Sequence, residues 1–174
     1  IPARAGSKRV NKKNVKQYSK KIIRNLILKN KIKRLTKGYY TLYEDITLIV
    51  FCFQPAYLGL QNALSYHNLW EQETNPVVLT TKKTRRGIRE VMGNNVLIRN
   101  IDKKYFFGFD YYKNGDFYLP YSDIEKTFID MIYYKLYMDN ELLKEFKRRI
   151  NKKKLLEYLK SYPKNIQKRE KSKI

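Results

Sequence analysis

Residues 19–42, SKKIIRNLILKNKIKRLTKGYYTL, decide how the first part of this chain folds. Ser19 is a residue type that favours the N-cap position, and four apolar residues then recur at helical spacing. These apolar residues are Ile22, Ile23, Leu26 and Ile27. The spacing predicts a short helix with one apolar face that ends near Asn30.

A hairpin is predicted directly after this helix, from segments 31–35 and 39–43 joined by Thr36-Lys37-Gly38. A short helix with a basic outer face, followed at once by a basic hairpin, is typical of the end of a winged helix-turn-helix, where the helix enters the DNA major groove and the hairpin forms the wing. The sequence therefore predicts DNA contacts from both elements. The candidate DNA-binding residues are Lys20, Lys21, Arg24, Asn25, Lys33, Arg34 and Lys37.

The charge of this region separates DNA binding from an ordinary solvated surface. Short amphipathic helices followed by hairpins occur in many α+β domains, and lysines on an outer face are usually only solvated. Residues 1–43, however, contain fourteen Lys or Arg residues and no acid, the first being Glu44. A surface of one sign is costly unless a polyanion neutralises it. Nucleic acid is therefore the expected partner.

The distribution of charge also predicts the domain organisation. The net charge of +22 divides into +14 for residues 1–43, −2 for residues 44–143 and +10 for residues 144–174. We expect a winged-helix head at 1–43, with residues missing before Ile1, an α+β body at 44–143, and a basic tail at 144–174, helical and partly disordered.

Several classes of protein are disfavoured by composition. With one Cys and one His, the chain has no disulfide framework and a zinc site is not expected, nor is any other metal or cofactor. The apolar run 46–53 is far shorter than the roughly 20 residues that cross a bilayer. No signal peptide is visible, so the cytoplasm is the expected compartment and no membrane partner is expected.

The body reads as a small mixed sheet, mostly antiparallel, with helices. Residues 46–53 have strand character, yet Asp45 could equally cap a helix there, and both interpretations stay open. A helix is expected at 61–70. The extended segments expected are 55–60, 77–81, 96–101, 105–111 and 116–120.

Further helices are expected toward the end of the chain. Ser122-Asp123-Ile124-Glu125 reads as a capping box that starts a helix and uses the Glu125 carboxylate to close the helix end. Leu64, Phe128 and Ile132 are assigned to the core. Helices are also predicted at 141–150 and 153–162, and residues 164–174 are predicted to be disordered.

Two enzyme interpretations compete with DNA binding. The opening IPARAGSKRVNKKNV resembles the nucleotide-binding loop of the acylneuraminate cytidylyltransferases, although no βαβ alternation follows it. Asp110, Asp116, Glu125 and Asp130 suggest a metal-dependent nuclease, but the Glu-x-Lys spacing of such sites is absent because Glu125 and Lys126 are adjacent. His67 has no nucleophile motif near it and is expected to be a core residue. No catalytic residue is therefore predicted.

Three later blocks carry a second resemblance. PAYLGLQNALSYHNLWEQETNPVVLTTKK, FFGFDYY and SDIEKTFIDMIYY resemble, in this order, blocks of the AbiEi-type regulators, which are antitoxins of type IV toxin-antitoxin systems. The wing motif of that family is matched by RLTKGYY at 34–40. Its later motifs are matched by Ala63, Leu64, His67, Glu125, Lys126 and Asp130. The chain departs from the family pattern at Asn68, where a glycine is usual.

The resemblance implies a function that spacing alone does not. A regulator of this type represses its own operon by binding double-stranded operator DNA, expected to be an inverted repeat, through the head. Its body counters a nucleotidyltransferase-like toxin without forming a stable complex. The expectation is therefore a DNA-binding regulator and antitoxin, with an enzyme, either a truncated nucleotidyltransferase or a nuclease, as the alternative.

Overall fold

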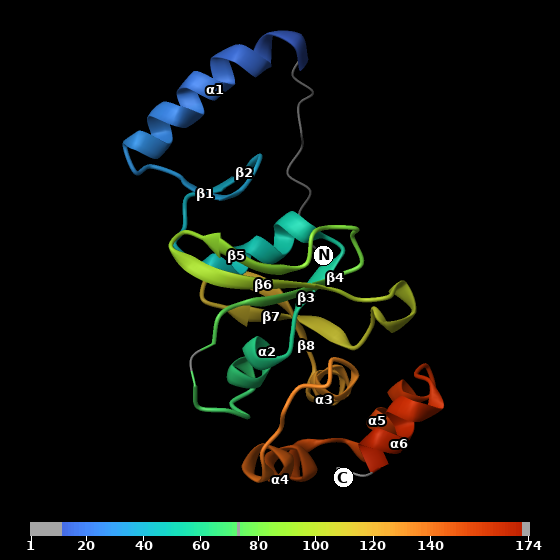
Figure 1. The fold of residues 1–174 in the computed structure, drawn as a ribbon. Helices are drawn as coiled ribbons and strands as arrows, with labels where there is room; N and C mark the ends of the chain where they lie inside the picture. Colours follow the sequence, from blue (N-terminus) through green and yellow to red (C-terminus); the bar gives the residue numbers. More distant parts are fainter. Residues whose placement is uncertain (1–11, 73, 172–174) are drawn as a thin grey trace. The chain divides into compact units, whose positions relative to one another are not determined.

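The computed structural model describes residues 12–72 and 74–171 (Figure 1). The chain forms two compact units, Ile1–Glu44 and Asp45–Ile174, here called unit 1 and unit 2. The opening that resembles the cytidylyltransferase loop lies at residues 1–15, and residues 1–11 of it are outside the described residues. Each unit is described by itself.

Unit 1 consists of helix α1 (Lys12–Leu28) and a hairpin of β1 (Lys33–Thr36) and β2 (Tyr39–Thr41). The helix closes where Asn30 adopts a φ of 51° and the Lys31 N–H donates to the carbonyl of Leu26 at 2.9 Å. Strand β1 pairs antiparallel with β2, and Gly38 in the connection has a φ of 85°, which favours glycine. The predicted hairpin and its turn are confirmed.

The predicted start of the helix is wrong. A helix beginning after Ser19 was expected, whereas α1 runs without interruption from Lys12, so Ser19 lies inside it. No Gly or Pro lies between Lys12 and Leu28, so the sequence contains no strong helix breaker there. A serine within a continuous helix has no free N–H groups two or three residues ahead to cap.

Unit 2 is built on a six-stranded mixed sheet, and the whole fold is α+β. The strand order is β5-β6-β4-β3-β8-β7. Pairs β3–β4, β5–β6 and β7–β8 are antiparallel, while β3–β8 and β4–β6 are parallel. The strands are β3 (Ala56–Leu58), β4 (Val77–Thr80), β5 (Gly87–Val91), β6 (Asn94–Asn100), β7 (Phe109–Asn114) and β8 (Phe117–Ser122).

Helical segments cover both faces of this sheet (Figure 1). On one face lies η1 (Ile46–Phe53), a 3-10 helix that packs on β3, β4 and β8. On the other lie α2 (Gln61–Tyr66) and α3 (Ile124–Tyr133). The remaining helical segments are η2 (Lys103–Tyr105), α4 (Asn140–Arg149), α5 (Lys152–Leu159) and α6 (Lys164–Lys171).

Asp45 settles the open interpretation of residues 46–53. Its carboxylate accepts from the Thr47 N–H at 2.9 Å, which satisfies a donor at the start of a helical turn. The segment is therefore helical rather than a strand, although its residue types favour strands. Burial on the sheet outweighs that preference, since Leu48, Ile49 and Val50 are buried.

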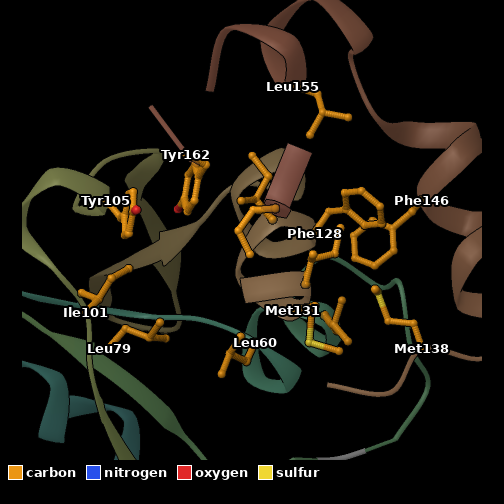
Figure 2. Packing of buried hydrophobic residues seen from close by; sticks show 14 of the residues in the cluster. Leu60, Leu79, Ile101, Tyr105, Phe128, Met131, Met138, Phe146, Leu155 and Tyr162 are labelled. Atoms are coloured by element: carbon orange, nitrogen blue, oxygen red, sulfur yellow. The ribbon is translucent and has the colours of Figure 1, made fainter. Parts of the chain in front are cut away.

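The core of unit 2 is centred on α3 (Figure 2). Phe128 is fully buried and lies against Phe146 of α4, with ring centroids 4.9 Å apart. Leu64, Phe128 and Ile132 are all buried, which confirms their assignment to the core. Leu142, Leu155, Leu159 and Ile166 from α4, α5 and α6 belong to the same cluster. Residues 144–171 are therefore part of this core rather than a separate tail.

Strand β5 and helix α6 differ from the sequence expectation in kind, and Tyr105, expected to begin an extended segment, lies in the 3-10 helix η2. Strand β5 was not predicted, because GIREV alternates poorly and the strand pairs with β6 alone at the sheet edge. Residues 164–171 were predicted to be disordered but form α6. Ile166 and Glu170 of α6 are buried, so two positions anchor an otherwise polar helix.

The predicted capping box is also corrected. The N-cap of α3 is Asp123, whose carboxylate accepts from the Lys126 N–H at 2.7 Å. Glu125 instead accepts from the Asn151 N–H at 2.7 Å, at the start of α5. Its carboxylate does close a helix end, but that of a helix 26 residues further along the chain.

Candidate nucleic-acid interface

The polar face of α1 carries four of the seven predicted DNA-binding residues. Lys20, Lys21, Arg24 and Asn25 are all exposed. At 100° per residue these four positions lie within an arc of about 140°. Ile23, Leu26 and Ile27 are half-buried. One face of the helix therefore presents three cations and an amide together.

The hairpin carries the other three residues, and they differ in availability. Arg34 and Lys37 are exposed, with Lys37 in the turn beside Gly38. Lys33 is half-buried and forms an ion pair with Glu44. The hydrogen bond and the charge of Lys33 lower the pKa of Glu44. Lys33 is thus partly neutralised within unit 1, unlike Arg34 and Lys37.

Glu44 is the only acid in the sequence of unit 1, and it forms an ion pair with Lys33. Among the residues that the structure describes, none of the other six predicted contacts forms an ion pair. Sequence reasoning left out Lys29 and Lys31, which are exposed between α1 and β1. Their signal was the same one-sign run of charge. Unit 1 therefore presents an acid-poor cationic surface on two adjoining elements.

Unit 2 holds a different polar cluster, which is closed to solvent. Lys126 and Asp130, one turn apart on α3, form an ion pair with both side chains fully buried. The Tyr57 hydroxyl donates to Asp130 at 2.7 Å, and Lys126 donates to the Tyr162 hydroxyl at 2.9 Å. Burial lowers the pKa of Lys126 and raises that of Asp130. The cluster joins β3, α3 and the segment between α5 and α6, and it serves the fold.

The carboxylates considered for a nuclease do not converge. Asp110 accepts from the adjacent Tyr111 N–H at 2.7 Å, Glu125 caps α5, and Asp130 is buried with Lys126. Asp116 is exposed in the turn between β7 and β8. Among the described residues no group of three or more His, Cys, Asp or Glu side chains is placed to hold a metal ion.

His67 lies at the end of α2, half-buried between aromatic rings. Its Nε2 lies 2.7 Å from the carbonyl oxygen of Ser122, so this nitrogen carries the proton and donates. The ring meets Tyr66 and Tyr112 edge-on, at centroid distances of 5.3 and 5.7 Å. This hydrogen bond ties the end of α2 to the end of β8 and agrees with a structural role.

Acidification is expected to destabilise unit 2 through His67. Burial, the largest effect, lowers the pKa of His67 below its ordinary 6.5. As pH falls, the unfolded chain therefore binds the proton first, and the contribution of neutral His67 is lost below about pH 6.5. We expect the melting temperature to decrease as the pH is lowered from about 7.5 to about 5.5. His67→Gln should remove this pH dependence. His67 is the only histidine, so an unchanged pH profile in His67→Gln would contradict the assignment.

Comparison of the sequence with protein-family models and with curated proteins identifies no relative. Within the described residues, none of the helices combines the length and the apolar character needed to cross a bilayer.

Proposed function

We propose that this chain is a sequence-specific regulator that binds double-stranded DNA in the cytoplasm through unit 1. The observation that carries the proposal is the cationic surface of α1 and the hairpin, where Glu44 is the only acid in the sequence of unit 1 and forms an ion pair with Lys33. Such a surface is unfavourable by itself and is stabilised by phosphate. An inverted-repeat operator read by two copies is the expected target.

Each element has its own task in this proposal. Helix α1 enters the major groove, where the Arg24 guanidinium pairs with a guanine edge and the Asn25 amide suits adenine. Arg34 and Lys37 on the hairpin bind backbone phosphates, which fixes the register without reading sequence. Base contacts then provide specificity, and phosphate contacts provide most of the salt-dependent affinity.

The resemblance to AbiEi-type antitoxins extends the proposal to unit 2. Unit 2 would counter a nucleotidyltransferase-like toxin without a stable complex, while unit 1 represses the operon. The motif residues Leu64, Lys126 and Asp130 are fully buried, and His67 holds two elements together. They maintain the fold of unit 2, so residues that face a toxin must be sought among its exposed side chains.

Arg24→Ala and Lys37→Ala should affect DNA binding differently. An Arg-guanine contact contributes about 1 to 3 kcal/mol of discrimination, so Arg24→Ala should lose about 5- to 150-fold of operator preference and keep much of its non-specific affinity. Lys37→Ala should weaken binding to all sequences and lower the salt slope by about one unit. Fluorescence anisotropy with operator and random duplexes, over a salt series, measures both effects.

The same titration tests the proposal as a whole. If the head binds about four to six phosphates, the wild-type slope of log affinity against log salt should be about −4 to −5. Lys113→Ala, an exposed lysine on β7 of unit 2, serves as the control and should leave operator preference unchanged. A slope near zero, or no preference for any sequence selected from a random pool, would overturn the proposal.

The antitoxin half is tested by co-expression with a nucleotidyltransferase-like toxin, which this proposal expects to be encoded beside the gene. Arg24→Ala should still protect cells, because it leaves unit 2 unchanged. Loss of protection at unchanged expression and folding would show that protection works only through repression.

A further inference from the structure

A second acid-free cluster of cations lies in unit 2, on the connection from β4 to β5. Residues 82–86, KKTRR, are here called the basic loop. Lys82, Lys83, Arg85 and Arg86 are exposed, and none of them forms an ion pair in the part of the chain that the structure describes. From residue 74 to residue 89 the sequence has no acid. Four cations are thus presented by five consecutive residues.

The first part of the basic loop is fixed by hydrogen bonds from the sheet. The Lys82 N–H donates to the Thr80 hydroxyl at 3.0 Å, and the Lys82 carbonyl accepts from the Asn100 amide at 3.2 Å. Thr80 in turn donates to the carbonyl of Phe53 at 2.6 Å. The backbone of Lys82 is therefore held from two strands.

The second part is fixed by Arg89 of β5. Its Nη2 donates to the Thr84 hydroxyl at 2.9 Å and to the Arg85 carbonyl at 2.8 Å. Its guanidinium carbon lies 5.0 Å from the centroid of the Phe53 ring, a cation-π contact. Gly87, with a φ of 114°, then turns the chain into β5. Arg89 is a positioning residue that holds the loop while Lys83, Arg85 and Arg86 point their charges to solvent.

Protection of a sheet edge is the structural alternative for these cations. Charged residues on an edge strand discourage pairing with another chain. Such protection requires charge on the strand itself and does not require a fixed backbone in the neighbouring loop. Here the four cations precede β5, and ordering of Arg89 to brace them costs side-chain entropy. A fixed cationic loop fits a partner with regularly spaced anions better.

We propose that the basic loop is a second nucleic-acid contact, which binds backbone phosphates of duplex DNA without reading sequence. Five residues extend at most about 18 Å, and each strand of B-DNA places a phosphate about every 3.4 Å along the axis. The loop can therefore reach two to four phosphates. The planar guanidinium groups of Arg85 and Arg86 bind phosphate oxygens in pairs. The inference concerns unit 2 and does not rest on operator recognition by unit 1.

The test removes the charges of the loop in the full chain. In Lys83→Gln/Arg85→Gln/Arg86→Gln, the salt slope for binding to a random-sequence duplex should become less negative by about 2 to 3 units, since each phosphate contact contributes about 0.9. The residues that hold the loop are unchanged, so the melting temperature should stay the same. Preference for operator over random DNA should also be retained, because base contacts belong to unit 1.

The matched control removes the same charge elsewhere on unit 2. Lys113→Gln/Lys135→Gln/Lys160→Gln replaces three exposed lysines from separate segments and should change the slope by less than one unit. An equal change in both triple variants would attribute the effect to net charge and overturn the inference. An unchanged slope in the loop variant would also overturn it and would point to an acidic protein surface as the partner. If no sequence preference is found for the wild type, the proposed function fails while this test still decides the loop.

Discussion

Asp130→Ala is expected to lower the free energy of unfolding of unit 2 by about 3 to 5 kcal/mol. The Asp130 carboxylate is fully buried against the Lys126 ammonium group and accepts from the Tyr57 hydroxyl at 2.7 Å. Its removal leaves a buried cation and a buried hydroxyl without their acceptor. Urea denaturation of the full chain, followed by near-ultraviolet circular dichroism from the tyrosines of unit 2, measures the loss.

Two further variants separate charge from hydrogen bonding at this site. Glu157→Ala removes an exposed carboxylate from α5 and should change stability by less than about 0.5 kcal/mol. Lys126→Met in an Asp130→Asn background removes both charges while an acceptor for Tyr57 remains, and it should recover most of the lost stability. Equal effects of Asp130→Ala and Glu157→Ala would show that the ion pair is not buried in solution.

Phe128→Ala should cost about 3 to 5 kcal/mol of unfolding free energy in unit 2. The ring is fully buried at the centre of α3, so truncation removes apolar burial and leaves a cavity. We expect the melting temperature to fall by roughly 6 to 20 °C, since a loss of 1 kcal/mol lowers it by about 2 to 4 °C in a chain of this size. Leu156→Ala, at a side chain 56% exposed, is the control and should change little. A melting temperature unaffected by Phe128→Ala would contradict the placement of α3.

The partner ring on α4 makes this experiment sharper. Phe128 and Phe146 lie with centroids 4.9 Å apart and planes inclined at 59°. A double-mutant cycle with Phe146→Ala should give a coupling energy of about 0.5 to 1.5 kcal/mol. Strict additivity would mean that α4 folds independently of α3, as a separate tail would.

Local signals in the sequence predicted much of the architecture. The hairpin followed from Gly38, whose φ of 85° an L side chain rarely adopts, between two short runs of strand formers. The positions of Phe128 and Ile132 followed from the 3.6-residue period of an amphipathic helix. The acid-free run to residue 43 required no structure at all. Each of these features depends on residues close together in the chain, and for that reason it could be inferred.

The sequence predictions were wrong where contacts between residues far apart in the chain determine the local structure. Glu125 closes α5 rather than its own helix, because folding brings Asn151 beside it. The helix α6 is held by two buried positions, and the edge strand β5 by the pairing of its backbone with β6, so neither has a strong pattern of its own. No sequence pattern predicted that the basic loop is fixed, because its hydrogen bonds come from Thr80, Arg89 and Asn100 on three different strands.

The sequence by itself determined an α+β chain whose first 43 residues are cationic and acid-free and which has an amphipathic helix after Ser122, because charge, turn residues and helical period are local properties. Only the tertiary structure decided that Lys126 is buried and that residues 144–171 belong to the core. A lysine is placed on the surface by any local rule, since burial of a charge is costly. Here Asp130 and the two tyrosine hydroxyls compensate for that burial, and the tyrosines are brought there from 69 residues before and 36 residues after Lys126 by the fold itself.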